Sequence, residues 1–115
     1  MMVRRVPRYT PTEDQIALAT FQHWRTLGLP DTLVASIPNK KAFGQAGLTP
    51  GLPDLLVMAP GLKVGFLELK RRIDSPVSKA QFEFIQLCER LGIPRAIAVG
   101  RDEPIAQLKA WGVVR

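Results

Sequence analysis

Residues 51–70 constrain the fold most, because two apolar runs there flank a short loop that contains proline and glycine. The runs at 55–58 and 64–69 have the composition of β-strands. The loop between them, residues 59–63, reads Ala-Pro-Gly-Leu-Lys and has the composition of a turn. The stretch therefore predicts a β-hairpin.

The register of this hairpin places two carboxylates side by side. A turn centred on Gly61 puts Asp54 opposite Glu68. Opposed residues of an antiparallel pair have Cβ atoms roughly 5 Å apart, and like charges there are destabilising. Lys70 shares a face with Glu68, because side chains alternate faces along a strand. The apolar pairs expected in this register are Leu56 with Phe66 and Met58 with Val64.

A cation would remove the repulsion between these two carboxylates. Ligands that are all oxygen favour a hard ion such as Mg²⁺ or Mn²⁺. An Asp, a Glu and a Lys at one end of a hairpin therefore form a candidate metal site.

These motifs resemble a known group of nucleases. The sequence Gly51-Leu52-Pro53-Asp54, followed by Glu68-Leu69-Lys70 after an apolar strand, is similar to the motif pair of the PD-(D/E)XK nucleases. The form Gly-Leu-Pro-Asp-Leu, with Ser-x-x-Gln at 78–81, most resembles the VRR-NUC branch, the virus-type replication-repair nucleases. The resemblance extends over residues 13–99 and implies one nuclease domain over residues 1–115, with residues 1–9 as a basic arm.

The resemblance also implies a set of site residues and a Mg²⁺ or Mn²⁺ cofactor. The expected metal ligands are Glu13, Asp54, Glu68 and the main-chain carbonyl of Leu69. The expected catalytic residues are Asp54, Glu68, Lys70 and Gln81. Lys70 would orient the nucleophile and stabilise the transition state, and Gln81 would position the attacking water or the phosphate. The expected nucleic-acid contacts are Lys40, Lys41, Arg71, Arg72 and Lys79.

Several of these residues also have a structural interpretation. Thr10 as N-cap and Pro11 at the first helical position would make Glu13 the third residue of a capping box, in a helix that runs to about Leu27. Glu13 nevertheless shares the apolar face of that helix with Ala17, Phe21 and Trp24, so a site role stays open, with Asp14 as the substitute.

Capping and solvation are the alternatives for the other candidates. Gln81 would complete a capping box with Ser78, which by itself explains a glutamine there. Lys40 and Lys41 are also compatible with an ordinary solvated loop, and Arg71 and Arg72 reach either phosphate or solvent.

Two aromatic residues, one of them the single histidine, have no expected part in the chemistry. His23 adjoins Trp24 rather than a carboxylate, so a ligand or general-base role is not favoured. Trp111 is expected to pack in the core or an interface rather than to stack on a base.

The remaining segments complete an α/β domain. Residues 33–37 predict a first strand, and 42–46 a helical turn. A helix from Ser78 to Gly92 precedes a strand at 95–99 that should lie parallel to the second hairpin strand. A short helix then opens at Glu103 and Pro104. The expected buried stripe of the middle helix is Phe84, Ile85, Cys88 and Leu91. The order matches the αβββαβ core of restriction-endonuclease-like folds: a mixed four-stranded sheet of three antiparallel strands and one parallel strand, flanked by helices.

Size and charge set the outer limits. A chain of 115 residues with 46% hydrophobic content supports one core. It has no apolar run of about 18 residues and no apolar segment after its basic start, so neither a membrane span nor a secretory signal is expected. A cytoplasmic location is expected instead. The single cysteine, Cys88, has no internal disulfide partner. The net charge of +6 favours a polyanionic partner.

Three functional hypotheses follow. The first is a metal-dependent nuclease that hydrolyses branched or duplex DNA, as a structure-selective endonuclease in replication, repair or recombination. A homodimer would let two copies act on two strands. The second is a non-catalytic nucleic-acid-binding module with a degenerate nuclease site. The third is a structural or interaction domain in which Glu68 and Lys70 form a surface ion pair.

Overall fold

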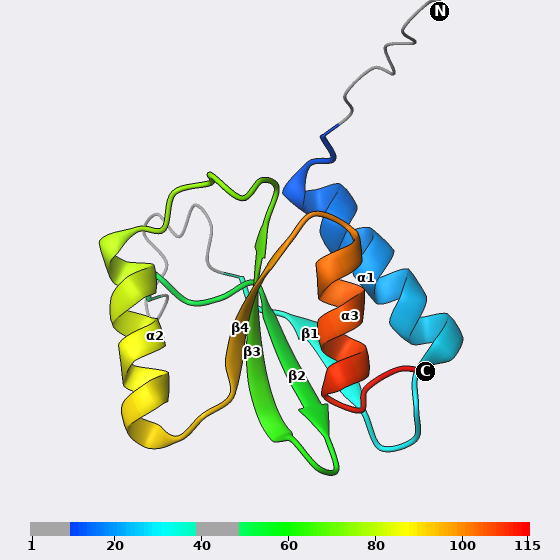
Figure 1. Ribbon diagram of the computed structural model, residues 1–115. Helices are drawn as coiled ribbons and strands as arrows, with labels where there is room; N and C mark the ends of the chain where they lie inside the picture. Colours follow the sequence, from blue (N-terminus) through cyan, green and yellow to red (C-terminus); the bar gives the residue numbers. More distant parts are fainter. Residues whose placement is uncertain (1–9, 39–48) are drawn as a thin grey trace, which may run out of the picture.

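A mixed four-stranded sheet forms the centre of the computed structural model, which describes residues 10–38 and 49–115 (Figure 1). The strands lie side by side in chain order: β1 (Leu33–Ser36), β2 (Leu55–Ala59), β3 (Lys63–Lys70) and β4 (Arg95–Val99). The first three are antiparallel, and β4 is parallel to β3. The helices are α1 (Glu13–Leu27), α2 (Lys79–Leu91) and α3 (Asp102–Ala110). The predicted αβββαβ order and mixed sheet are confirmed.

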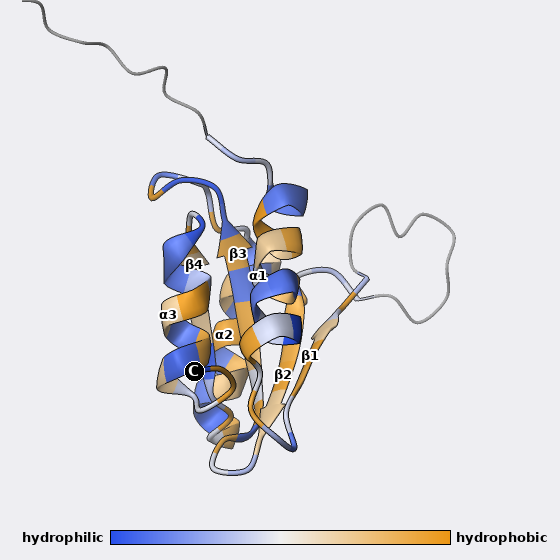
Figure 2. Ribbon diagram, turned by 90° about the vertical axis from the view of Figure 1, so that its right-hand side faces the viewer, coloured by the Kyte–Doolittle hydropathy of each residue, from blue (hydrophilic) through white to orange (hydrophobic). Residues whose placement is uncertain are grey.

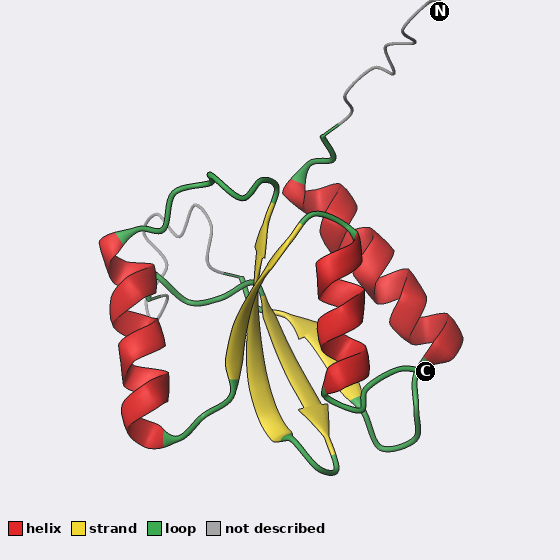
Figure 3. Cartoon of the chain, in the orientation of Figure 1, coloured by secondary structure: helices red, strands yellow, loops and turns green. Residues whose placement is uncertain are grey.

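The helices cover the two faces of the sheet unequally. Helices α1 and α3 lie on one face and α2 lies alone on the other (Figures 1 and 3). The main core forms between the sheet and the α1 and α3 side, and Figure 2 shows apolar strands beside helices with hydrophilic stretches. Its fully buried apolar residues are Ile16, Leu55, Val57, Leu67, Leu69, Leu108 and Val113. On the α2 face, Phe66 meets Phe84 edge to face, with ring centroids 5.2 Å apart.

The hairpin of β2 and β3 has the register expected from its sequence. Leu56 pairs with Phe66 and Met58 pairs with Val64. The ladder ends one pair before the predicted carboxylate pair, at Leu55. Asp54 therefore belongs to the loop that enters β2, and its carbonyl accepts a hydrogen bond from the Ile37 N–H at 2.8 Å.

The start of α1 differs from the prediction. Thr12, not Thr10, is the N-cap, and Gln15 completes the capping box. The Thr12 hydroxyl accepts from the Gln15 N–H at 3.1 Å, while the Thr12 N–H donates to Gln15 Oε1 at 2.9 Å. Glu13 is the first residue of the helix, so capping no longer explains it. The most deeply buried residues of α1 are Ile16 and Thr20, with Trp24 packed at the margin of the core.

Helix α2 begins as predicted but is covered less than expected. Ser78 and Gln81 form the capping box, and Gly92 ends the helix in the left-handed conformation, at φ 69°. Cys88 is buried, and burial raises the pKa of its thiol. Leu91 was expected to be buried but is 62% exposed, so the predicted buried stripe does not extend to the last residue of α2.

Two further predictions concern the remaining segments. Trp111 packs against the core, as expected. The predicted helical turn at 42–46 and the basic arm at 1–9 lie outside the described residues. None of the helices in the described part of the chain has the length and apolar character that crossing a membrane requires.

Candidate active site

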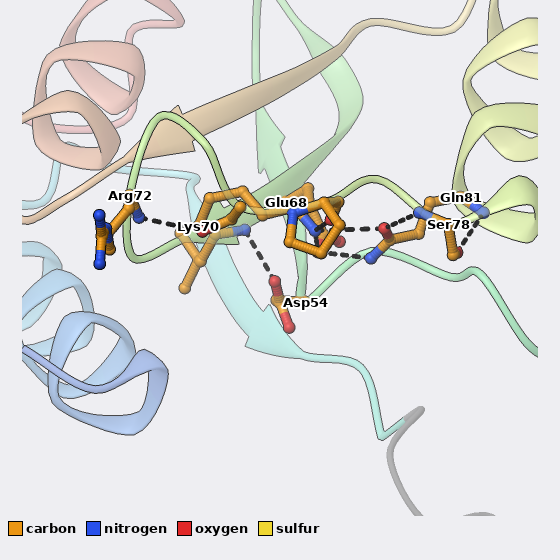
Figure 4. Close-up of polar contacts among 9 residues, drawn as sticks. Asp54, Glu68, Lys70, Arg72, Ser78 and Gln81 are labelled. Carbon is orange, nitrogen blue, oxygen red and sulfur yellow. Dashed lines mark hydrogen bonds and ion pairs between the residues drawn. The ribbon is translucent and has the colours of Figure 1, made fainter.

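The predicted catalytic residues meet at the carboxyl end of β3. Glu68 and Lys70 project from β3 toward the α2 side, Gln81 comes from the first turn of α2, and Asp54 comes from the loop before β2 (Figure 4). They line a pocket of about 230 Å³. Its full lining is Glu13, Gly51, Leu52, Asp54, Glu68, Lys70, Ser78 and Gln81. The tertiary structure thus brings together residues from four segments of the chain.

Lys70 is held in place by three protein oxygens. Only 7% of this residue is exposed. Its ammonium donates to the Pro76 carbonyl at 2.9 Å and to Gln81 Oε1 at 3.1 Å, and it lies 3.5 Å from Glu68 Oε2. Burying a charge is tolerated when it is paired and hydrogen-bonded. The ammonium therefore has a fixed position beside Glu68.

Gln81 serves the helix cap and the pocket at the same time. Its Oε1 accepts from the Ser78 N–H at 2.9 Å, as a capping box requires. The same oxygen accepts from Lys70, and Nε2 donates to Glu68 Oε2 at 2.9 Å. Capping and a place in the site were alternatives in the sequence, but the geometry satisfies both.

Glu68 has an unusually high affinity for its proton. Burial is the largest cause, and the negative charge of Asp54 is the second; together they raise the pKa of Glu68 to about 7. Lys70 opposes this shift, and Glu13 adds to it. Asp54 and Glu68 line the same pocket, in keeping with their predicted proximity, although they are not a ladder pair.

Asp54 ties the end of β2 to the end of β3. Its Oδ2 accepts from the Leu69 N–H at 2.7 Å. Backbone groups of successive strand residues point to opposite sides, and the Lys70 carbonyl accepts from the Gly100 N–H at 2.8 Å, on the β4 side. The Leu69 carbonyl is therefore directed toward the Asp54 side of β3.

Gly51 lets the Asp54 loop approach α2 closely. Its φ is +85°, in the left-handed region that favours glycine. A Cβ built there would lie 2.4 Å from the Ala80 carbonyl carbon, in the first turn of α2. The first residue of the Gly-Leu-Pro-Asp motif thus sets the spacing between the Asp54 loop and the helix that carries Gln81. The sequence motif contains this glycine but does not reveal that role.

Glu13 borders the pocket from α1. It also lines a neighbouring hollow of about 200 Å³ together with Asp14, Asp54 and Leu69. Within residues 10–38 and 49–115, however, no three His, Cys, Asp or Glu side chains converge into a ready metal site. A role for Glu13 in metal binding therefore stays a prediction.

The donor set fits a hard divalent cation. Asp54, Glu68 and the Leu69 carbonyl offer only oxygen atoms, and Mg²⁺ in proteins is commonly held by one or two carboxylates, with water and phosphate as its other ligands. Burial and the negative charge of Asp54 together outweigh the effect of Lys70 on Glu68, so the pKa of Glu68 is raised. These residues would be the ligands of Mg²⁺ or Mn²⁺.

The predicted nucleic-acid contacts differ in what their side chains bind. Arg71 donates to main-chain carbonyls of the segment before α1, and Arg72 forms an exposed ion pair with Asp74 at 3.2 Å. Lys79 is exposed at the start of α2. Lys40 and Lys41 lie outside the described residues. The Pro76 carbonyl was not predicted as the partner of Lys70, because a main-chain acceptor cannot be recognised from residue types.

The solved structures similar to this chain include two with a VRR_NUC domain. One, described as a "VRR_NUC domain protein", has 21% sequence identity and a TM-score of 0.74, and the match covers 96% of this chain and 99% of that chain. The chain has the VRR_NUC fold. The other, described as a "VRR_NUC domain", has 20% identity and a TM-score of 0.60, with 85% of this chain and 94% of that chain covered.

Two further comparisons found no match. No family model matches the chain, and no curated protein matches it. The resemblance to VRR-NUC proteins that the Gly-Leu-Pro-Asp and Glu-Leu-Lys motifs predicted is therefore confirmed through the fold. The VRR_NUC fold carries the pocket at the end of β3.

Proposed function

We propose that this protein is a Mg²⁺- or Mn²⁺-dependent nuclease that hydrolyses phosphodiester bonds in DNA. The observation that carries the proposal is the joint placement of Asp54, Glu68, Lys70 and Gln81 around one pocket of a VRR_NUC fold. A purely structural ion pair would not need a second carboxylate that destabilises the first. Structure-selective endonuclease activity in replication, repair or recombination is the finer form of the proposal.

The chain's own residues supply charge and orientation. Asp54, Glu68 and the Leu69 carbonyl would hold the cation. A bound Mg²⁺ or Mn²⁺ would supply Lewis acidity toward a phosphate oxygen and lower the pKa of a bound water. Lys70 holds a positive charge at a fixed place beside Glu68, where it stabilises negative charge that develops at the phosphate.

Gln81 fixes the relative positions of the charged side chains. Its amide joins the Lys70 ammonium to the Glu68 carboxylate, so both side chains keep one orientation. Such preorganisation reduces the reorganisation that the reaction itself would require. Gln81 therefore acts on catalysis by orienting Lys70 and Glu68, and by facing the substrate.

The basic charge of the chain supports a nucleic-acid substrate. With a net charge of +6, the protein attracts polyanions through contacts that release counterions from the phosphates. The proposed DNA contacts at Lys40, Lys41, Arg72 and Lys79 carry no sequence information, so the shape of the substrate would decide selectivity.

The deciding experiment combines cleavage with metal binding. Purified protein is incubated with Mg²⁺ or Mn²⁺ and labelled single-stranded, duplex, flap and junction DNAs, beside Asp54→Asn and Lys70→Ala. We expect metal-dependent cleavage by the wild type and none by either variant. Because a ligand that binds the folded state stabilises it, Mn²⁺ should also raise the Tm of the wild type, and Asp54→Asn should lose most of that rise.

The matched control is Glu83→Gln, which removes an exposed carboxylate from α2 outside the pocket lining. It should cleave DNA and respond to Mn²⁺ like the wild type. An equal Mn²⁺ response in wild type and Asp54→Asn would exclude the paired-carboxylate site. DNA binding with no cleavage under any metal would instead favour the non-catalytic binding module.

A further inference from the structure

Arg71 joins two segments that are far apart in the sequence. Its Nε donates to the Pro11 carbonyl at 3.0 Å, and its Nη2 lies 3.4 Å from the Thr10 carbonyl. These partners are 60 and 61 residues away along the chain. Arg71 directly follows Lys70 at the end of β3, whereas Thr10 and Pro11 directly precede the capping box of α1. The contact fastens the start of α1 to the end of β3.

The chemistry of the contact suits arginine. The guanidinium is a planar fork with several donors in fixed directions, so it can bind two successive carbonyls at once. A lysine would keep the positive charge but would lose this two-point geometry. An arginine that only attracted phosphate through charge would not need to bind carbonyls.

The fastened segment controls where Glu13 lies. Pro11 is two residues before Glu13. The capping box of Thr12 and Gln15 restrains the first turn of α1, which contains Glu13. A shift of the Pro11 carbonyl would therefore move the first residue of α1. Glu13 faces the pocket that contains Asp54 and Glu68, so such a shift would change the negative charge at the pocket rim.

We propose that Arg71 is a positioning residue that holds the start of α1 against β3 and thereby keeps Glu13 at the rim of the pocket. This inference rests on the proposed function, because negative charge at that rim serves to attract a cation. It replaces the earlier assignment of Arg71 as a phosphate contact. Arg71 acts through Glu13 and not on the substrate.

The test measures Mn²⁺ affinity in the absence of DNA, from the rise of Tm with Mn²⁺ concentration. We expect Arg71→Ala and Arg71→Lys each to weaken Mn²⁺ binding about fivefold, the scale of one nearby charge in water. Glu13→Gln should weaken it to the same degree. The double variant Arg71→Ala/Glu13→Gln should bind no more weakly than Glu13→Gln alone, because residues that act through one interaction are not additive. Arg90→Ala, at the far end of α2, is the matched charge control and should bind Mn²⁺ like the wild type.

A second readout is independent of metal. Amide hydrogen exchange in the segment 10–18 should be faster in Arg71→Ala and Arg71→Lys than in the wild type, and unchanged in Arg90→Ala. Additive losses in the double variant, or wild-type Mn²⁺ affinity in Arg71→Lys, would overturn the positioning role. If the wild type itself does not respond to Mn²⁺, the proposed function fails, and the role toward the cation fails with it. Faster exchange would then still establish the fastening contact, and unchanged exchange would refute it.

Discussion

At the scale of single residues, burial and a neighbouring carboxylate let Glu68 keep its proton to a higher pH than an ordinary glutamate. Its pKa is raised from 4.5 to about 7. In the unfolded chain the same group would ionise near 4.5. Between these values the folded protein binds more protons than the unfolded chain, so the free energy of unfolding should fall as pH rises. Above the folded pKa this contribution is constant.

The first prediction concerns that pH window. In EDTA, the free energy of unfolding of the wild type relative to Glu68→Gln should decrease from pH 4.5 to about 7 and then level off. Denaturant unfolding at a series of pH values measures the difference. Parallel profiles for the two proteins over this range would contradict the assigned pKa. Metal binding should strengthen over the same window, since a carboxylate must lose its proton to bind a cation.

The second prediction concerns Gln81. Gln81→Ala loses the capping box and should cost about 1 kcal/mol of stability. Gln81→Glu keeps an acceptor for the Ser78 N–H, but it replaces the Nε2 donor with a carboxylate oxygen facing Glu68. We therefore expect the Glu variant to fold with its cap intact yet to show an altered Mg²⁺ requirement and slower cleavage.

Circular dichroism and chemical unfolding test the cap, and cleavage across a Mg²⁺ titration tests the site. Gln86→Glu, an exposed position on the same helix, is the control for added charge. Wild-type cleavage and an unchanged Mg²⁺ requirement in a well-folded Gln81→Glu protein would show that Gln81 only caps the helix and has no role in the site.

At the scale of elements, the site depends on how closely α2 approaches the loop before β2. Helix α2 lies by itself on one face of the sheet, and its first turn carries Ser78 and Gln81 (Figure 1). The loop that contains Asp54 meets that turn at Gly51 and Ala80. Because backbone atoms form this contact, a larger residue cannot be accommodated by a change of rotamer.

The third prediction follows for Gly51→Ala. The added Cβ would meet the Ala80 backbone at 2.4 Å, and φ is +85°, so both the contact and the backbone conformation are strained. We expect a loss of about 1–3 kcal/mol in the free energy of unfolding, with loss of Mn²⁺ binding as the loop and α2 separate. Gly61→Ala is the control, because a Cβ there meets no atom within 4 Å. Equal stability of the two variants would show that the close approach is unimportant.

At the scale of the whole molecule, charge and topology place the pocket at one end of the sheet. Strands β3 and β4 are parallel, so their carboxyl ends lie at the same end of the sheet, where Lys70 is beside Val99. Helix α3 runs from that end of the sheet to the opposite side of the domain, where the C-terminus lies (Figure 1). Basic residues near the pocket and basic residues at the far end should therefore differ in their effect on DNA binding.

The fourth prediction concerns the salt dependence of DNA binding. The double variant Lys40→Ala/Lys41→Ala should weaken DNA binding, and it should reduce the slope of log K against log salt by about 2, as expected for two lost phosphate contacts. Lys109→Ala, in the last turn of α3, should change neither. The measurement is fluorescence anisotropy with labelled DNA in EDTA at several salt concentrations. A slope that both variants leave unchanged would remove the two lysines from the interface.

The sequence by itself determined the parts that local interactions decide. The register of the β2–β3 hairpin follows from one turn and the alternation of side chains, so Leu56 and Phe66 could be paired in advance. The capping box of Ser78 and Gln81 spans only three residues, and it was predicted correctly. The parallel placement of β4 follows from the order strand, helix, strand, because a helical crossover returns the chain to the starting end of β3.

Only the tertiary structure decided the interactions that join distant segments. Two threonines could each have capped α1, and the sequence favoured Thr10 where the structure uses Thr12. The partners of Arg71 are main-chain carbonyls 60 residues away, which residue types do not reveal. Gln81 reaches Glu68 from a helix whose first turn lies close to Gly51 of the Asp54 loop. These contacts depend on the distance between backbones, and packing of the whole domain fixes that distance.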